Sequence, residues 1–284
     1  MMKNSVLVTG ASGFVGRSLL RSLEREDYPV IPLVRSPKKL PNEVVLDFTD
    51  DDFPRKIQEL PPVDAVIHLG AKIDWDASKS KLFLPNVLAT ANLVNWARSA
   101  GAQFIFASTI TVCGAHTPAI KKDTKTNLDT NYGYSKWLSE ELIKMSGVEH
   151  LILRISGIYG RNGPRHLGIN KAIDHAIRGD PPVRSGKGDA RRNYIYVEDL
   201  SGIIIDSLRK KITGVHLVAG PEAISIAEML KTICEVFLPG KNPISEEGGK
   251  SFDQIVEHSD ELIPGRKFRE ALEHIKNESR SSDW

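Results

Sequence analysis

Cysteine is scarce in this sequence: Cys113 and Cys234 are the only two among 284 residues. A pair so widely spaced forms neither a disulfide framework nor a Cys-x-x-Cys zinc site, so we expect no bound metal and a reducing, cytoplasmic environment. Long apolar runs are absent too, and few residues precede the first apolar run, so neither a membrane span nor a signal peptide is expected. The net charge of +2 gives no reason to expect nucleic acid or an anionic membrane as a partner.

What the sequence does contain is an alternation of strand-like and helix-like segments, with 40% apolar residues to build a core. Strands are predicted at 5–9, 30–34, 43–46, 63–69, 103–107, 150–155 and 215–218. Helices are predicted at 14–25, 82–100, 134–145 and 197–209. This alternation predicts an α/β fold, a Rossmann doubly wound parallel sheet with a smaller C-terminal substrate lobe.

Glycine, proline and arginine become dense after residue 160, which marks a change of organisation. We place the dinucleotide-binding Rossmann domain at 1–160 and 193–218, and the substrate-binding lobe at 161–192 and 219–284. In this lobe a helix is expected after the cap-like Ser225, a loop at 239–250 and a final helix at 266–276.

Three glycines follow the first predicted strand and open the first predicted helix. Gly10 permits a tight turn, Gly13 lets the backbone approach a pyrophosphate, and Gly16 lets the helix pack closely on the sheet. Free amides at the start of the helix and its dipole stabilise bound phosphates. We therefore predict that a dinucleotide binds here, contacted also by the residues between the glycines, Ser12, Phe14 and Val15.

The end of the second predicted strand carries no acid to accept a hydrogen bond from a ribose 2′-hydroxyl. Arg35 and Lys38 follow it instead. Their positive charge favours a 2′-phosphate, so we predict NADP. NAD is the alternative, in which both are ordinary solvated side chains.

Tyr132 and Lys136 form a YxxxK motif whose four-residue spacing puts both side chains on one face of a helix. A nearby ammonium stabilises phenolate, so Lys136 is predicted to lower the pKa of Tyr132 toward the working pH. Tyr132 would then exchange a proton with a carbonyl or carbinol oxygen while hydride moves at a nicotinamide. Tyr134 cannot replace it, because Lys136 is then only two residues away.

The glycine loop, TGASGFVG at 9–16, resembles that of the short-chain dehydrogenase/reductase superfamily, and most closely its extended branch. That branch includes nucleotide-sugar epimerases, dehydratases and reductases. The resemblance covers nearly the whole chain and is strongest at 5–160 and 191–199. Residues 106–114 resemble the family's SSxxVYG segment, which implies that Thr109 is the catalytic hydroxyl, with Ser108 as the alternative. Cys113 stands where tyrosine is commoner, and we expect a buried structural thiol there.

The resemblance also implies further cofactor contacts. Residues 68–71 resemble an HxAA turn that passes beneath the cofactor, with a structural His68 and with Gly70 where alanine is usual. The contacts implied outside the glycine loop and the YxxxK pair are Asp47, Phe48, Leu69, Gly70, Ala71, Asn86 and Ile155.

Three residues are implied to meet substrate besides Thr109. Residues 153–160 resemble the LRxxNVYGP segment, with Gly157 where asparagine is frequent, and Ser156 can offer a hydroxyl instead. Arg192 matches the arginine of an RDFxYVxD segment that lies near the substrate's diphosphate, and a guanidinium suits bidentate phosphate binding. In that segment Asp199 is expected to cap the following helix.

The resemblance narrows the reaction. Ile110 and Thr111 stand where 4,6-dehydratases carry an Asp-Glu pair, so water elimination is not expected. The sequence therefore favours an NADP(H)-dependent 4-keto reductase or 4-epimerase of a nucleotide-sugar. The alternatives are an NADPH-dependent carbonyl reductase similar to the dihydroflavonol-reductase group, and a non-catalytic NADP-sensing protein. The family resemblance also implies a homodimer that pairs through the helices at 82–100 and 134–146.

Overall fold

The computed structural model describes residues 5–249 and 251–280, and the chain forms two compact units. The first comprises Met1–Ala115, Asp123–Ile155 and Ser201–His216, and the second comprises His116–Lys122, Ser156–Leu200 and Leu217–Trp284. The boundaries expected from the sequence differ at 116–122, 156–160, 193–200 and 217–218, which they assign to the dinucleotide-binding domain.

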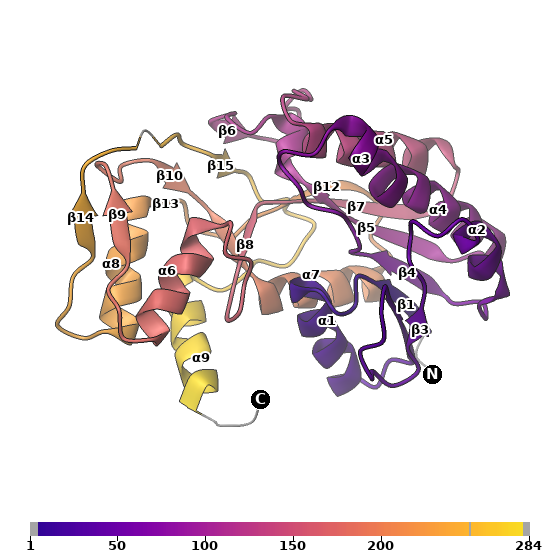
Figure 1. The fold of residues 1–284 in the computed structure, drawn as a ribbon, viewed down its shortest axis with the longest axis horizontal. Coiled ribbons are helices and arrows are strands. Elements are labelled where there is room, and N and C mark those ends of the chain that lie inside the picture. Colours follow the sequence, from indigo (N-terminus) through magenta and orange to yellow (C-terminus); the bar gives the residue numbers. More distant parts are fainter. Residues whose placement is uncertain (1–4, 250, 281–284) are drawn as a thin grey trace. The chain divides into compact units, whose positions relative to one another are not determined.

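A seven-stranded parallel sheet organises the first unit (Figure 1), as predicted. Its strand order is β12-β7-β5-β4-β1-β2-β3. The strands are β1 (Val6–Thr9), β2 (Val30–Val34), β3 (Val44–Val45), β4 (Ala65–His68), β5 (Gln103–Thr109), β7 (His150–Ile155) and β12 (Gly214–Val218). The chain order reverses between β1 and β4, the point in such sheets where a crevice opens at the carboxyl ends of the strands.

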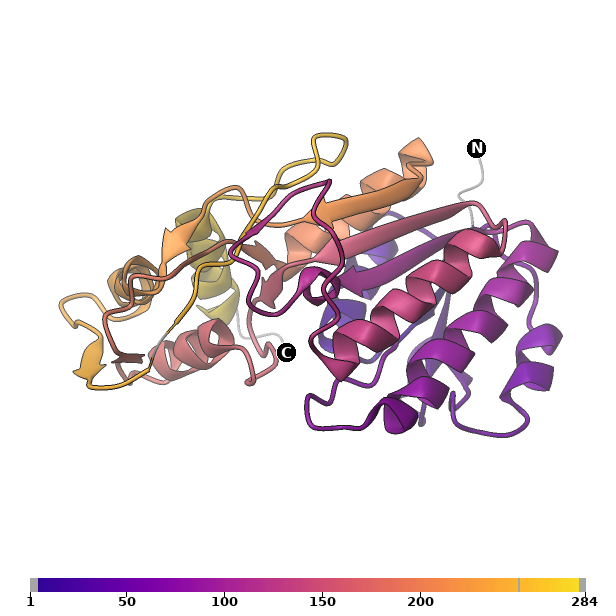
Figure 2. The same ribbon diagram turned by 90° about the horizontal axis from the view of Figure 1, so that it is seen from above.

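Helices cover both faces of this sheet. One face carries α1 (Phe14–Arg25) and the part of α7 (Val197–Lys210) that begins at Ser201, joined by a buried contact of 2.9 Å between the hydroxyls of Ser18 and Ser201. The other face carries α4 (Ala89–Ala100) and α5 (Asn131–Met145), which lie side by side in Figure 2. The short helices are α2 (Phe53–Lys56), η1 (Ile57–Glu59), α3 (Lys79–Leu82) and η3 (Ile110–Cys113).

The predicted helix at 82–100 is interrupted at its start. A π-helical turn, η2 (Phe83–Leu88), stands between α3 and α4. Pro85 lies inside this turn and lacks the amide hydrogen that a continuous α-helix would use there. Periodicity of apolar residues could not reveal this change, because it registers which face is apolar and not the hydrogen-bond pattern.

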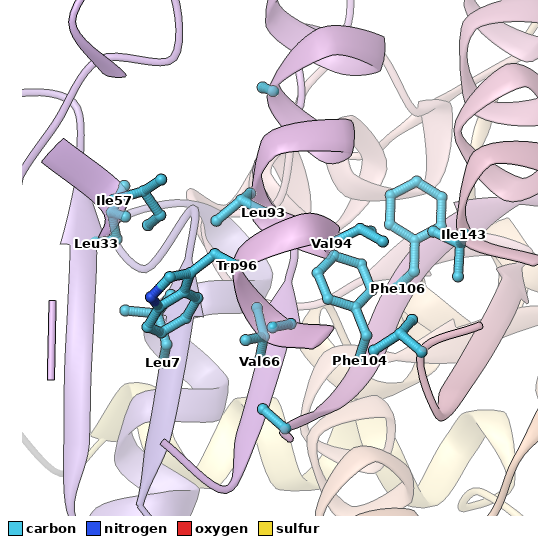
Figure 3. Close-up of a cluster of buried hydrophobic side chains, with 14 of the residues drawn as sticks. Leu7, Leu33, Ile57, Val66, Leu93, Val94, Trp96, Phe104, Phe106 and Ile143 are labelled. Carbon is cyan, nitrogen blue, oxygen red and sulfur yellow. The ribbon is translucent and has the colours of Figure 1, made fainter. Parts of the chain in front are cut away.

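A dense apolar core fixes β5 and α5 in place (Figure 3). Phe104 and Phe106 of β5 pack in it with Val94 of α4 and Ile143 of α5, and each is at most 2% exposed. Full burial of such a side chain contributes about 1.5–3 kcal/mol. The strand end and the helix that carry the predicted catalytic residues are therefore anchored to one rigid body.

The described residues of the second unit form the first turn of α7, three complete helices and short paired strands. The helices are α6 (Gly168–Ile177), α8 (Ile226–Phe237) and α9 (Phe268–Arg280). The strand pairs are β6 (Ala119–Ile120) with β15 (Ile255–Val256), β8 (Gly157–Tyr159) with β11 (Tyr194–Tyr196), β9 (Val183–Ser185) with β14 (Ile244–Glu246), and β10 (Arg191–Arg192) with β13 (Ile224–Ser225).

Two predictions in this unit have different outcomes. Ser225 does cap α8, in a capping box with Glu228. The loop expected at 239–250 instead contains β14, which pairs with the distant strand β9. Its polar local sequence does not reveal this pairing. Residue 250 lies outside the described residues. None of the helices in the described parts of the chain is long and apolar enough to cross a membrane.

Candidate active site

The glycine loop folds tightly between β1 and α1. Gly10 has φ +66°, and a Cβ there would lie 2.8 Å from the backbone nitrogen of Gly70, at the end of the neighbouring strand β4. A Cβ on Gly16 would lie 2.2 Å from the carbonyl oxygen of Gly10. Both positions therefore require glycine for close backbone approach.

The start of α1 is open to an anion. Gly13 is its N-cap, offers no side-chain acceptor, and is exposed, and the first turn carries no acidic residue. The first amides of a helix have no partner within the helix, so those of Phe14 and Val15 are available to phosphate oxygens. The geometry fits a dinucleotide phosphate at this position.

Arg35 and Lys38 follow β2 as exposed side chains. Sequence reasoning missed Glu43, whose carboxylate accepts hydrogen bonds from the amides of Lys38, Lys39 and Leu40 at 2.9–3.1 Å. These bonds, above all that from Leu40, lower the pKa of Glu43. Glu43 thus holds the basic loop in shape through backbone contacts.

Phe48 explains why residue 70 is glycine. A Cβ on Gly70 would lie 2.7 Å from Cε2 of the Phe48 ring and 3.1 Å from the Thr9 hydroxyl. The ring stands edge-on to His68, with centroids 5.7 Å apart. The space that an alanine methyl would occupy is therefore filled by an aromatic side chain from the loop after β3. Asp47 beside it accepts from the amide and hydroxyl of Thr49.

Gly70→Ala is expected to lower the free energy of unfolding by about 1–3 kcal/mol, because the added methyl overpacks this contact. Chemical denaturation measures the change. The matched control is the double variant with Phe48→Leu, which makes room for the methyl and should show a smaller combined loss than the two single changes added together. Simple additivity would contradict the proposed steric conflict.

His68 and Asn86 are hubs of hydrogen bonds. His68 is fully buried, with Nδ1 2.6 Å from the Thr9 hydroxyl and Nε2 3.0 Å from that of Thr90. Burial lowers its pKa well below the ordinary value, so it is neutral and structural, as predicted.

Asn86, in the π-helical turn, accepts a hydrogen bond from the amide of Lys72 at 2.7 Å and donates to the Lys72 carbonyl at 3.0 Å and to the Ser135 hydroxyl at 3.1 Å. It therefore ties the segment after β4 to α5.

Thr109 ends β5 and caps the short helix η3. Its Oγ1 lies 3.0 Å from the Thr111 hydroxyl and accepts from the Thr111 amide. The carbonyl of Thr111 packs against the first turn of α5, where a Cβ on Gly133 would come within 2.7 Å of it. Ser108, the alternative, points elsewhere and donates to Glu140. The Thr109 hydroxyl therefore contacts η3, which packs against α5, whereas the Ser108 hydroxyl is bound to Glu140.

Tyr132 and Lys136 lie on the first turns of α5, 9% and 2% exposed. The Lys136 ammonium stands 3.8 Å from the centroid of the Phe106 ring. Burial lowers the pKa of Lys136 to about 7, although Glu140 opposes this shift. Burial also raises the pKa of Tyr132. The predicted lowering of the Tyr132 pKa is therefore wrong for this structure, because removal of the hydroxyl from water raises its pKa and the lysine expected to lower it is itself desolvated.

A buried polar network lies behind these residues, and sequence reasoning missed it. Glu140 is fully buried and accepts two bonds from Nε of Arg154 and one of 2.7 Å from its Nη2. Arg154 also reaches Cys113, which is 1% exposed and whose pKa is raised chiefly by burial. Cys113 is thus a buried thiol, as predicted. The signal for Glu140 was its spacing of four residues from Lys136, on the same helical face.

The remaining cofactor and substrate candidates divide between the units. Leu69 and Ala71 follow β4, and Ile155 is the last residue of β7, all in the first unit. Ser156, Gly157 and Arg192 belong to the second unit. Within the described residues, the Ser156 hydroxyl and Nε of Arg192 are buried without a hydrogen-bond partner.

Tyr194 explains the glycine at 157. A Cβ there would lie 2.8 Å from the ring of Tyr194. No side chain can therefore reach from position 157 unless this ring moves, and only its backbone is available to a ligand. Asp199, expected to cap the following helix, lies instead within the first turn of α7. Its carboxylate accepts a hydrogen bond from the Arg266 amide at 2.7 Å and so holds the segment before α9.

One group in the second unit has the composition of a metal site. Glu198, His274 and Glu278 bring ligand atoms within 4.8 Å of one another. Arg266 lies 3.5 Å from the Glu198 carboxylate, and Nδ1 of His274 is 3.2 Å from the Tyr196 hydroxyl. The chain itself therefore already supplies a cation and a hydrogen-bond partner to this group.

Comparisons with known proteins identify a family and related folds. The family described as "NAD dependent epimerase/dehydratase family" matches residues 6–226. The chain is 29% identical over 248 residues to the "Putative UDP-glucose 4-epimerase" of Methanocaldococcus jannaschii, covering 80% of this chain and 81% of that protein. The fold of this chain is similar to that of a UDP-N-acetylglucosamine 4-epimerase from Bacillus cereus, with TM-score 0.87 and 23% identity. The match covers 98% of this chain and 100% of that chain. A UDP-glucuronic acid 4-epimerase from Bacillus cereus, solved in complex with NAD, gives TM-score 0.79 at 21% identity, with 96% and 99% covered.

Proposed function

Because the chain belongs to the NAD dependent epimerase/dehydratase family, we propose that it transfers hydride at a carbonyl or carbinol carbon of a nucleotide-sugar. The observation that carries this proposal is the arrangement of Thr109, Tyr132 and Lys136. All three lie where β5 and η3 pack against the first turns of α5, within one unit that also contains the phosphate-binding loop. That arrangement supplies a proton donor and a hydrogen-bond donor for one reacting oxygen.

The residues present fit a dinucleotide. The amides at the start of α1 would receive its phosphates, and the tight turn at Gly10, packed against the backbone of Gly70, brings this loop close to the end of β4. The nicotinamide, when bound, supplies or takes up the hydride. The exposed Arg35 and Lys38 support a preference for NADP over NAD. Against this stands the NAD named for the Bacillus cereus relative.

Tyr132 acts as the proton donor and acceptor. Its buried hydroxyl keeps its proton at neutral pH, since burial raises its pKa, and it can donate that proton to a carbonyl oxygen as negative charge develops there. Lys136, in its charged form, makes loss of that proton less costly. The Thr109 hydroxyl donates a hydrogen bond to the same oxygen and holds it in place.

A nucleotide-sugar is the proposed substrate because one relative named for a UDP-sugar aligns over 80% of this chain at 29% identity, and a solved structure named for another shares the fold. In the second unit, the unpartnered Nε of Arg192 and the hydroxyl of Ser156 are polar groups that a substrate diphosphate or sugar would satisfy. The reaction is a 4-keto reduction or a 4-epimerisation. A dihydroflavonol-type carbonyl reductase gains support if Arg192 makes no contribution to substrate affinity, and a non-catalytic NADP sensor if no carbonyl substrate is turned over.

The test combines cofactor identification with turnover. Purified protein is analysed by mass spectrometry for retained dinucleotide, then assayed for epimerisation of UDP-sugars and for NADPH oxidation by nucleotide 4-keto sugars. Sugar-dependent NADPH oxidation supports the reductase, and tightly held NAD with epimerisation supports the epimerase. Protein that binds the dinucleotide yet turns over no nucleotide-sugar would contradict the proposal.

A homodimer is the proposed assembly. Phe83, Leu84 and Leu88 of η2, and Leu142 and Met145 of α5, are large apolar side chains 37–82% exposed on two helical segments that pack together. Such clustering typically marks an interface. Light scattering on purified protein would give twice the chain mass of 31.4 kDa, and a monomer at micromolar concentration would contradict it.

A further inference from the structure

An indole stands beside Tyr132 with half its surface free. Trp75, in the segment between β4 and α3, is 46% exposed, and its ring meets that of Tyr132 edge-on with centroids 5.5 Å apart. Exposing so much of a tryptophan forgoes the favourable burial of its apolar surface. Trp96, in the core of the same unit, is only 4% exposed. Trp75 is therefore positioned at the proposed catalytic tyrosine without being buried by the fold.

The segment that carries Trp75 is held at both ends. Asn86 binds the amide and the carbonyl of Lys72, and the side chain of Asn131 donates to the carbonyl of Ala77 at 3.0 Å. Ala77 is buried in one apolar cluster with Leu82 and Tyr132. Between these anchors Asp74 accepts from the amide of Asp76 at 3.2 Å. The backbone on either side of the indole is thus fixed by hydrogen bonds, a pre-organised arrangement that suits ligand contact.

We propose that Trp75 is a specificity-determining residue whose indole stacks on the apolar C–H face of the substrate's sugar ring while Tyr132 engages the reacting oxygen. The inference rests on the proposed function. A pyranose presents C–H groups on one face, and the electron-rich face of an indole attracts their partial positive charge. Ile73, two residues earlier and 52% exposed, adds further apolar surface to the same segment. If Trp75 only covered Tyr132 and had a structural role, removing the indole would not change the affinity for the sugar.

The discriminating probes are UDP alone and the corresponding UDP-sugar, because only the second carries the ring that Trp75 would contact. Trp75→Ala is expected to raise the KM and Kd for the UDP-sugar by about tenfold to a hundredfold, and to leave the inhibition constant for UDP and the affinity for dinucleotide within about threefold. Trp75→Phe should recover part of the loss. An equal loss for UDP and UDP-sugar, or no change in either, would overturn the proposal.

Fluorescence keeps the test informative if Trp75→Ala folds poorly. UDP-sugar should quench tryptophan emission more than UDP does, and this difference should vanish in Trp75→Phe. It should persist in the control Trp137→Phe, which changes a tryptophan of α5 whose ring centroid lies 5.9 Å from that of Tyr134. Persistence of the difference in Trp75→Phe would overturn the inference but leave the proposed function intact. Wild-type protein that binds dinucleotide but no UDP-sugar would instead refute the proposed function, and the inference with it.

Discussion

Tyr132→Phe is expected to lower kcat by about a thousandfold, since removal of a positioned general acid typically costs between about a hundredfold and ten-thousandfold. The phenyl ring preserves the apolar contact with Trp75 and the cluster with Ala77 and Leu82. Dinucleotide affinity and thermal stability should therefore change little. Steady-state kinetics with saturating cofactor, together with a dinucleotide titration, measure the two effects separately.

The matched control is Tyr134→Phe. Tyr134 lies two residues away on α5, where the Lys79 ammonium stands 4.0 Å from the centroid of its ring, a contact that phenylalanine retains in weaker form. This variant should keep kcat within about threefold of wild type, as expected for a surface substitution. If Tyr132→Phe retained most of the activity, or if Tyr134→Phe lost it, the assignment of the proton donor would be wrong.

Lys136→Met should abolish turnover and at the same time stabilise the protein. The lysine is buried with its pKa lowered to about 7 from an ordinary 10.5, so the folded state binds its proton more weakly than the unfolded chain does. At pH 7 this difference is worth on the order of 3 kcal/mol or more against folding. Methionine occupies a similar volume without that charge, and Glu140 keeps its partner Arg154.

The stability difference has a defined pH dependence. Between about pH 7 and 10.5 the unfolded chain holds the Lys136 proton and the folded protein does not, so wild-type stability rises with pH across this window and is lost as pH falls toward 7. The advantage of Lys136→Met is therefore largest at pH 7 and below, and should shrink by about 3 kcal/mol by pH 9.5. Urea denaturation at the two pH values measures it.

Lys144→Met is the control for this pair of measurements, because Lys144 is exposed on the same helix and forms a surface ion pair with Glu141. Its effect should stay within about 0.5 kcal/mol at both pH values. A Lys136→Met variant that is less stable than wild type at pH 7 would show that the cation–π contact with Phe106 outweighs desolvation. Desolvation of Lys136 would then not control the pH dependence of stability.

The sequence predicted the fold well where local chemistry determines structure. β-branched runs, three glycines and the cap at Ser225 each specify a local conformation, and the sheet, the loop at Gly10 and the start of α8 follow them. Family resemblance implies that Thr109 acts with the YxxxK residues, and their joint catalytic role stays a prediction. The strand β14 escaped prediction because its partner β9 lies far away in the chain.

The site itself was less predictable, because burial is a property of the whole fold. The spacing of Tyr132 and Lys136 correctly places both on one helical face, but it says nothing of how little water reaches them, and desolvation reverses the expected direction of the Tyr132 pKa. The network of Glu140 with Ser108 and Arg154 joins three elements that no local pattern connects. Trp75 likewise could not be recognised as a candidate from sequence, because only the folded chain brings its ring into contact with Tyr132.

The contact between Phe48 and Gly70 couples two positions over evolutionary time. An alanine at 70 conflicts with the aromatic ring that fills its space, and a smaller residue at 48 alone leaves a cavity, so each single change destabilises the protein more than the pair of changes together would suggest. Acquisition of the more usual alanine is therefore linked to a substitution 22 positions away. Among descendants of this sequence the two positions should vary together, and alanine at 70 with phenylalanine at 48 should be the combination that selection removes.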